Sequence, residues 1–173
     1  MRVLLVAVVA IAALGAGVLI GWQLGSDESS TSASAEGIPA EVEATRAALL
    51  EAAESGDYEA LRPLLTDDLR YTFGESVDGG PIAYWQELER TTDERPLESL
   101  AAILKMPYVL AQGYYVWPWA YALRSSDALS PHERELLAPL GPPSEFFPEG
   151  VGYLGWRAGI APDGTLAFFV AGD

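Results

Sequence analysis

The longest hydrophobic stretch of the chain lies at its N-terminus. Residues 3–24 contain no charged side chain and only one polar side chain, Gln23. A helix of this length, rising about 1.5 Å per residue, spans roughly 33 Å and can cross the hydrocarbon core of a membrane. Arg2 precedes the stretch and two acidic residues follow it, so the positive-inside rule places the N-terminus in the cytoplasm. The pattern predicts an N-terminal transmembrane anchor over residues 1–25, with the rest of the chain outside.

The same stretch has a second interpretation, as a cleaved signal peptide. Ala33, Ser34 and Ala35 form an A-x-A pattern after which a signal peptidase would cut. The hydrophobic stretch exceeds the roughly 7–15 residues of the hydrophobic region of a signal peptide, and the A-x-A pattern lies well beyond its end. Both features favour an uncleaved anchor that holds a periplasmic or extracellular domain at the membrane. Cleavage after Ala35 would instead secrete the domain.

Small residues recur every four positions in the predicted anchor, at Ala13, Gly17, Gly21 and Gly25. Such spacing lines one face of a helix and lets a second helix approach closely, so it predicts a homodimer through this face. Glycine is also frequent in transmembrane helices in general, which is the simpler explanation. Residues 26–37 are small, polar and acidic, and they predict a flexible tether.

The spacing of hydrophobic residues after the tether predicts five helices in a domain over residues 38–173. Prolines and side chains that cap helices mark where each helix begins. The predicted helices begin at Pro39, Asp57, Pro81, Pro96 and Ser130. Gly56 is placed to end the first helix, and the fourth helix must stop before Pro107. The third helix carries Trp85 on its inward side.

Runs of aromatic and aliphatic residues predict five strands, over residues 69–73, 108–110, 114–123, 151–160 and 165–171. The last two are joined by Ala-Pro-Asp-Gly at residues 161–164, which is typical of a hairpin turn. Residues 140–150 are rich in proline and glycine, and we expect a loop there. Helices come first and strands come mostly last. This order predicts an α+β domain, in which an antiparallel sheet is covered on one face by helices.

Composition supports a folded domain and narrows the chemistry that it can perform. Hydrophobic residues make up 50% of the chain, which is enough for a packed core. The net charge is −15, from 25 acidic and 10 basic residues, so the surface repels nucleic acid. The chain has no cysteine, which excludes disulfides and thiol chemistry, and its single histidine, His132, disfavours histidine-based catalytic triads. No glycine-rich phosphate loop, H-E-x-x-H motif or EF-hand loop is visible, so we expect no cofactor and no metal site.

Two stretches near the start of the domain resemble a known superfamily. Residues 53–61 have the sequence Ala-Glu-Ser-Gly-Asp-Tyr-Glu-Ala-Leu, and residues 65–69 have Leu-Thr-Asp-Asp-Leu before a predicted strand. In this region the chain is similar to an NTF2-like (SnoaL-like) domain. The resemblance implies a cone, in which a strongly curved antiparallel sheet wraps around the N-terminal helices and encloses an apolar pocket.

The same resemblance bears on catalysis. Enzymes of the superfamily place an acid/base carboxylate at or near the end of the first strand, whereas residues 71–74 carry no acid and the next one is Glu75. We therefore expect no catalytic residue. The C-terminal half resembles a group of exported bacterial proteins without an assigned activity, through Tyr-Val-Trp-Pro at residues 115–118 and through residues 159–173.

Aromatic residues supply most of the candidate ligand-binding positions. Tyr115, Trp117, Trp119 and Tyr121 alternate, so all four would share one face of a regular strand. An exposed row of rings is a platform for sugar rings or apolar ligands, although the apolar residues between these rings favour burial in the core. The candidate ligand-binding residues are Tyr71, Phe73, Trp85, Tyr115, Trp117, Trp119 and Arg157.

Arg157 is the only charged residue of the predicted strand 151–160. A guanidinium group in such apolar surroundings must contact a carboxylate or a ligand anion. A salt bridge to one of the many acidic residues is the simpler outcome. Arg157 is nevertheless the best single candidate for a polar group in a pocket.

These observations favour a membrane-tethered, non-catalytic module outside the cytoplasm, which binds a small apolar ligand, a glycan or an envelope protein. The alternative is a small enzyme, with Glu75, Asp78 or Asp68 as its base and Tyr71 or Arg157 as the electrostatic partner. A third hypothesis is a structural role through dimerisation of the anchor.

Overall fold

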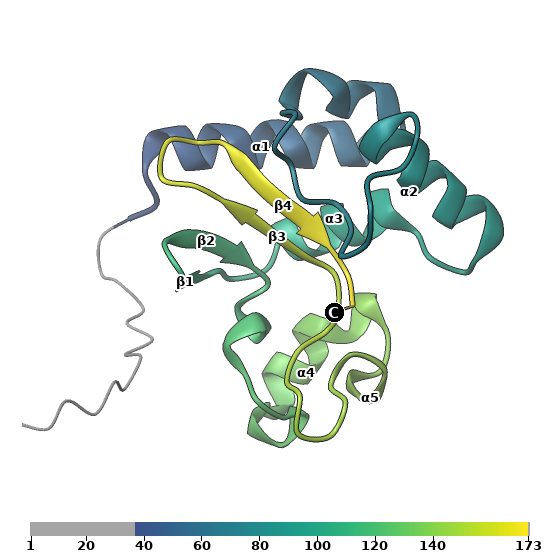
Figure 1. The fold of residues 1–173 in the computed structure, drawn as a ribbon. Coiled ribbons are helices and arrows are strands. Elements are labelled where there is room, and N and C mark those ends of the chain that lie inside the picture. The colour runs from purple at the N-terminus through teal and green to yellow at the C-terminus, as the bar shows by residue number, and fades with distance from the viewer. Residues whose placement is uncertain (1–36, 173) are drawn as a thin grey trace, which may run out of the picture.

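The computed structural model describes residues 37–172, which form an α+β domain with a four-stranded antiparallel sheet (Figure 1). The predicted anchor, its glycine-rich face, the A-x-A pattern and all of the tether except Gly37 lie outside the described residues. Within residues 37–172, none of the helices combines the length and the hydrophobicity needed to cross a membrane.

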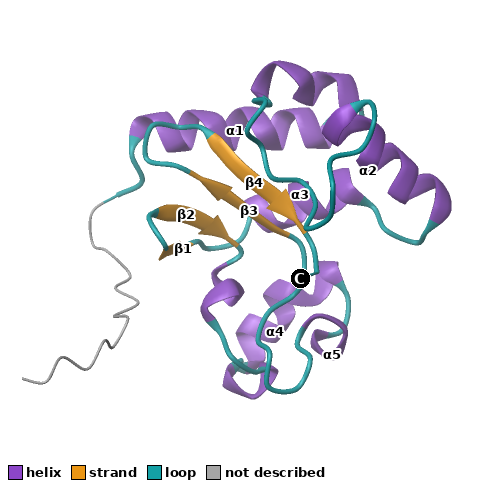
Figure 2. Cartoon of the chain, viewed as in Figure 1, coloured by secondary structure: helices purple, strands orange, loops and turns teal. Residues whose placement is uncertain are grey.

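Five helices begin where the sequence predicts them (Figure 2). They are α1 (Ala40–Glu54), the 3₁₀ helix η1 (Tyr58–Leu64), α2 (Gly80–Thr91), α3 (Pro96–Leu104) and α4 (Pro131–Leu137). The capping residues act as expected, because the Asp57 carboxylate accepts from the Glu59 N–H and Ser130 forms a capping box with Glu133. The predicted loop 140–150 is interrupted by a further short helix, α5 (Pro143–Phe146).

The sheet has the strand order β1-β2-β3-β4, and each neighbouring pair is antiparallel. The strands are β1 (Val109–Ala111), β2 (Tyr114–Trp117), β3 (Arg157–Ile160) and β4 (Leu166–Val170). The two predicted hairpins are confirmed, but the strands are shorter than predicted. Two of the predicted strands need a physical correction, and the predicted strand 69–73 is not part of the sheet.

The backbone of the segment 69–73 pairs with the sheet at Arg70. Arg70 forms an isolated parallel bridge with Phe168 of β4, in which the Arg70 N–H donates to the Ala167 carbonyl and the Arg70 carbonyl accepts from the Phe169 N–H. The chain then turns away, since the Gly74 N–H donates to the hydroxyl of Thr72. A side-chain turn of this kind competes with a strand for the backbone donors.

The prediction of a strand over residues 114–123 is wrong after Trp117. Pro118 has no N–H to donate to a neighbouring strand, and Trp119–Ala122 form a 3₁₀ helix. The alternating aromatic residues therefore do not share one face. The predicted strand 151–160 begins only at Arg157, because Gly152 has φ 103° and the Leu154 backbone bonds to Phe146 and Gly172 instead.

The main hydrophobic core lies between the sheet and helices α1, α2 and α3, and includes the fully buried Trp85, Trp117 and Phe169. In Figure 1, α3 lies behind the sheet and α1 runs along its upper side. A second cluster, formed by Met106, Ala120, Leu129, Leu137, Phe146, Phe147 and Tyr153, joins α4 and α5 to the rest of the domain. The helices thus cover one face of the sheet and leave the other face for a site.

Candidate functional site

Alternate residues of the central strands point to opposite faces of the sheet. Trp117, Ala158 and Phe169 are paired across three strands, and each is at most 1% exposed on the face that packs against the helices. Gly159 and its partner Phe168 lie on the opposite face. This face is uncovered and carries the candidate site.

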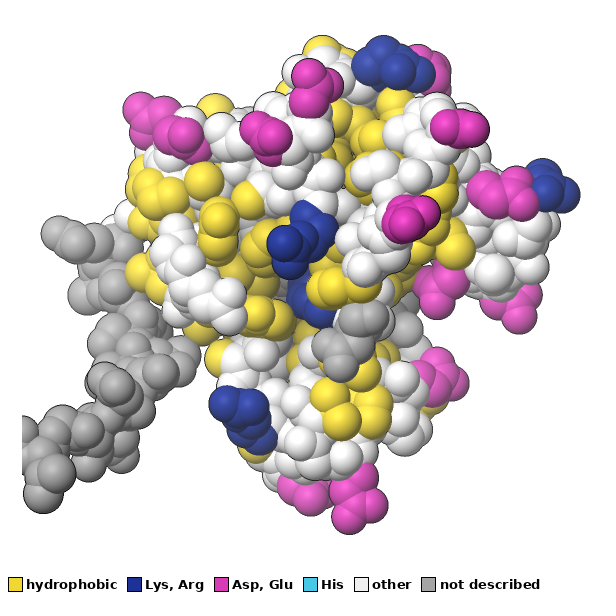
Figure 3. Space-filling view, viewed as in Figure 1, with side chains coloured by type: hydrophobic (Ala, Val, Ile, Leu, Met, Phe, Trp, Pro, Cys, Tyr) yellow, Lys and Arg dark blue, Asp and Glu magenta, His cyan; other side chains and the backbone are white. Residues whose placement is uncertain are grey.

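An open groove with a volume of about 610 Å³ lies on the uncovered face. Its lining combines aromatic rings with polar and charged side chains. These side chains include Asp68, Arg70, Phe73, Gln112, Tyr114, Tyr121, Arg157, Asp163, Thr165 and Phe168. Figure 3 shows this face, with basic side chains near its middle and hydrophobic side chains around them.

The Phe168 ring occupies the space beside Gly159. A Cβ atom on Gly159 would lie 2.1 Å from the ring, so the absence of a side chain at this position is what allows the ring to lie across β3. The Tyr114 ring packs edge-on against Phe168, with ring centroids 5.7 Å apart. The floor of the groove is therefore aromatic and held in place by the strands.

Charge is distributed unevenly along the groove. The β3–β4 turn, with Asp163 and Thr165, lies at one end, and Arg157 opposes Val170 at the other. Because the bridge between Arg70 and Phe168 is parallel, Asp68 precedes Arg70 toward the turn, and Phe73 follows it toward Arg157. At about 3.3 Å per residue, the strand from Arg157 to the turn spans roughly 13 Å.

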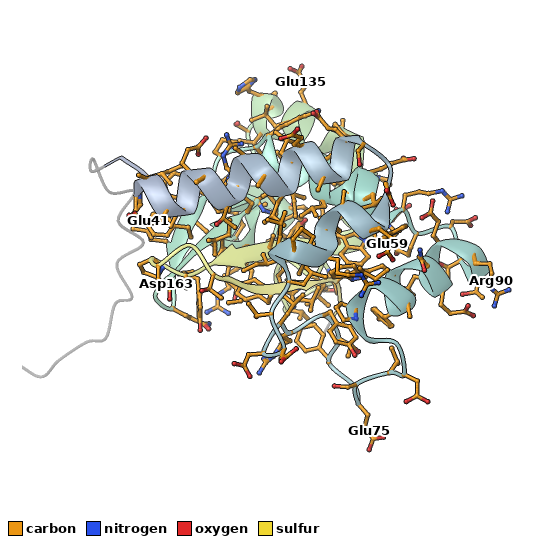
Figure 4. All side chains as sticks on the ribbon, turned by 90° about the horizontal axis from the view of Figure 1, so that it is seen from above. Glu41, Glu59, Glu75, Arg90, Glu135 and Asp163 are labelled. Carbon is orange, nitrogen blue, oxygen red and sulfur yellow. The ribbon has the colours of Figure 1, made fainter. Side chains whose placement is uncertain are left out.

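Figure 4 shows the position of the turn in the domain. Asp163, in the β3–β4 turn, lies at the same end of the domain as Glu41 in the first turn of α1. The β3–β4 turn contacts α1 directly, because the Thr45 hydroxyl donates to the Gly164 carbonyl over 2.7 Å. The acidic end of the groove is thus next to the point where the chain enters the domain.

Arg157 is 7% exposed and is held between backbone carbonyls and aromatic rings. Its Nη2 donates to the Gly172 carbonyl over 2.7 Å and its Nη1 donates to the Gly155 carbonyl over 3.2 Å. The guanidinium carbon lies 5.2 Å from the centroid of the Phe73 ring and 5.9 Å from that of Tyr121. These cation–π contacts fix the position of a positive charge at the wall of the groove.

Arg70 differs from Arg157 because its backbone is fixed while its side chain is exposed. Within the part of the chain that the structure describes, its guanidinium forms no hydrogen bond and no ion pair. Four other basic side chains, Arg46, Arg62, Arg90 and Lys105, are paired with nearby carboxylates. Arg70 is therefore the basic group of the groove that is best placed to meet a ligand.

Two of the predicted binding residues, Phe73 and Arg157, line the groove. Tyr71, Trp85 and Trp117 are buried in the main core, and Tyr115 packs against that core. Trp119 packs against the second cluster, where its indole N–H donates to Glu133.

The sequence-based selection missed Arg70, Tyr114 and Phe168. Phe168 follows the rule of alternation, since its neighbour Phe169 is buried, so the sequence contained a signal for it. Arg70 could be placed in the groove only through its bridge to β4, which joins segments almost a hundred residues apart in sequence. Sequence spacing offers no signal for that contact.

The carboxylates considered as catalytic bases lie in different places. Asp68 lines the groove, together with Arg157. Glu75 is exposed and points away from the domain in Figure 4, and Asp78 is exposed as well. Over residues 37–172, no group of three or more His, Cys, Asp or Glu side chains is arranged to hold a metal ion.

The fold and the site define an α+β domain with an open, polar and aromatic groove on the free face of its sheet. Comparison of the chain with protein-family models, with curated proteins and with solved structures gives no match. The relationship to NTF2-like domains thus stays a prediction.

Proposed function

We propose that the protein is a membrane-tethered, non-catalytic module that binds a glycan outside the cytoplasm, in the groove on the free face of the sheet. The observation that carries the proposal is the lining of the groove, which combines the exposed ring of Phe73 and the half-buried ring of Phe168 with carboxylate, amide and guanidinium groups. Among the three ligand classes that the sequence suggests, a glycan matches both parts of this lining.

Sugars combine two kinds of surface that this groove can bind. The apolar C–H face of a sugar ring stacks on aromatic rings, and Phe73 and Phe168 offer such faces. The hydroxyl groups of a sugar donate to carboxylates and accept from amides, which Asp68 and Gln112 provide. A wholly apolar ligand would instead bury these polar groups without hydrogen-bond partners, at a cost of about 1–3 kcal/mol for each group.

The predicted anchor and tether set the range over which the module would act. A flexible tether over residues 26–37 has a root-mean-square length of roughly 20 Å. Because the groove has one end near the start of α1, it would face molecules close to the membrane surface. A glycan of the cell envelope fits this position. An NTF2-like cone would be consistent with a sheet that is covered on one face by N-terminal helices.

The proposal can be tested by calorimetric titration of the full-length protein in lipid nanodiscs with a panel of oligosaccharides. Phe168→Ala removes the ring at the floor of the groove, and we expect it to weaken glycan binding about tenfold, equivalent to about 1.4 kcal/mol. Val77→Ala is the matched control, because Val77 is 40% exposed and does not line the groove. Failure of every oligosaccharide to bind, or equal binding by Phe168→Ala, would contradict the proposal.

A second candidate function is favoured by one observation, the presence of Asp68 and Arg157 in the same groove. In this alternative Asp68 acts as a general base and Arg157 stabilises negative charge that develops on the substrate. Mass spectrometry of each bound oligosaccharide after long incubation tests it. Turnover that is lost in Asp68→Asn would establish the enzyme, and unchanged oligosaccharides would support the binding module.

A further inference from the structure

We infer that the glycan recognised by this groove carries a carboxylate, which Arg70 binds while sugar hydroxyls face Asp68 and Asp163 toward the β3–β4 turn. The inference rests on the proposed function, since it specifies the class of glycan that the same groove accepts.

The groove differs in charge from the rest of the protein. The chain has a net charge of −15, which repels anions at long range. Two arginines, Arg70 and Arg157, nevertheless line one groove of the described domain. These two arginines offset the charges of Asp68 and Asp163 in the same lining, so the groove repels an anion less than the rest of this acidic protein does.

Arg70 has a fixed backbone and an exposed guanidinium group. Its N–H and carbonyl are both bonded to β4, over 3.0 Å each, so the Cα atom cannot move away from the groove. Its exposed guanidinium forms no ion pair with any residue of the described domain. A guanidinium offers two parallel N–H donors that match the two oxygens of a carboxylate, and this charge-assisted pairing is roughly twice as strong as a neutral hydrogen bond.

The acidic end of the groove sets the direction in which such a ligand would bind. The Asp163 carboxylate accepts from the Thr165 N–H over 2.9 Å, and this bond lowers the pKa of Asp163. The ionised Asp163 and the nearby Asp68 repel an anion and accept hydrogen bonds from hydroxyls. A sugar acid is therefore expected to bind with its carboxylate toward Arg70 and Arg157 and with its hydroxyls toward the β3–β4 turn.

The test uses ligands that differ only in charge. Trisaccharides of galacturonate, glucuronate and mannuronate are titrated into the full-length protein in nanodiscs of neutral lipid, each beside its methyl ester. The ester keeps the sugar ring and its stacking surface but removes the negative charge. We expect at least one acid to bind about tenfold more tightly than its ester, and this preference to decrease as the salt concentration rises.

The protein variants test the role of Arg70 separately. Arg70→Gln is expected to weaken binding of the acid about tenfold and to leave binding of the ester unchanged. Arg70→Lys keeps the charge but not the paired donors, and should give an intermediate loss. Arg90→Gln is the matched control, because Arg90 is an exposed arginine of α2 that pairs with Glu87 and does not line the groove. Thermal unfolding of each variant shows that the fold is retained.

The outcomes separate this inference from the function on which it rests. Equal binding of acids and esters, unaffected by Arg70→Gln, would overturn the inference and leave the glycan-binding module intact. Absence of binding by every acid and every ester would overturn both. A triglutamate peptide serves as a further arm, and its Arg70-dependent binding in the absence of sugar binding would also overturn both.

Discussion

Two neighbouring phenylalanines, Phe168 and Phe169, show how differently the two faces of the sheet are used. Phe169 is 1% exposed and packs against Trp85 and Trp156, with ring centroids 5.2 and 4.6 Å away. Phe168 faces the groove and packs edge-on against Tyr114. The same side chain thus packs in the core at one position and lines the groove at the next. Chemical type alone does not separate these roles, but alternation along the strand does.

The largest expected effect comes from replacing the inward ring. Phe169→Ala leaves a cavity between the sheet and α2, and we expect it to lower the free energy of unfolding by about 3–5 kcal/mol. Phe168→Ala removes a half-buried ring and should cost about 1–2 kcal/mol, in the usual range for single substitutions. Chemical denaturation of both variants measures the difference. Equal losses at the two positions would mean that the uncovered face is as tightly packed as the core.

The next largest effect on stability is expected at Gly159, where the Phe168 ring packs against β3. In Gly159→Ala the new Cβ must displace the Phe168 ring, because it would lie 2.1 Å from a ring atom. Overpacking of this kind costs about 1–3 kcal/mol, and displacement of the ring should also weaken glycan binding. Denaturation and calorimetric titration measure the two consequences.

A double variant provides the control for Gly159→Ala. When Phe168→Ala removes the ring, the added methyl group has no ring to displace, and the two substitutions should be clearly non-additive. We expect the double variant to be no less stable than Phe168→Ala alone. A double variant that loses the sum of the two single losses would show that the ring is not the cause.

How much of this arrangement could be predicted depends on the range of the interaction that fixes each part. Helix starts were predictable, because a proline or a capping side chain such as Asp57 or Ser130 acts on backbone groups within three residues. The lengths of the strands were not predictable in this way. The apolar pattern continues past Trp117, but Pro118 removes a backbone donor, and the backbone of Leu154 bonds to segments outside the sheet.

The candidate site was less predictable than the fold for the same reason. Arg157 stood out because it is a lone charge in an apolar sequence, and Phe73 because it is an aromatic residue of the predicted strand 69–73. Arg70 enters the groove only through a contact with β4, and Trp85 and Trp117 are buried in the main core between the helices and the sheet. Those facts depend on tertiary packing, which sequence spacing does not encode.

Tyr153 is a buried tyrosine that does not line the groove. Tyr153 belongs to the second cluster, where burial raises its pKa well above the usual value for tyrosine, and its hydroxyl donates to the Trp156 carbonyl. The raised pKa means that its stabilising contribution is complete below the unfolded value of about 10 and is lost as the pH rises above it. One such group gives a slope of about 1.4 kcal/mol per pH unit.

The measurement is the free energy of unfolding between pH 8 and pH 11. We expect stability to fall above about pH 10, and Tyr153→Phe to reduce the slope by about 1.4 kcal/mol per pH unit while costing about 1 kcal/mol at neutral pH through the lost hydrogen bond. Tyr58, whose pKa is also raised by burial, provides an independent contribution that Tyr153→Phe leaves in place. An unchanged slope would show that Tyr153 is accessible to water.

The smallest effect on stability, and the sharpest separation of the two faces, is expected at Phe73. Its side chain is 45% exposed, so Phe73→Ala should change the free energy of unfolding by less than about 0.5 kcal/mol. Its ring nevertheless lies over the guanidinium of Arg157 and lines the groove, so the same substitution should weaken glycan binding several-fold. Val77→Ala, at a comparably exposed position outside the groove, should change neither quantity. A Phe73→Ala variant that unfolds easily would assign this ring to the packing of the domain, and one that binds normally would place the ligand elsewhere on the sheet.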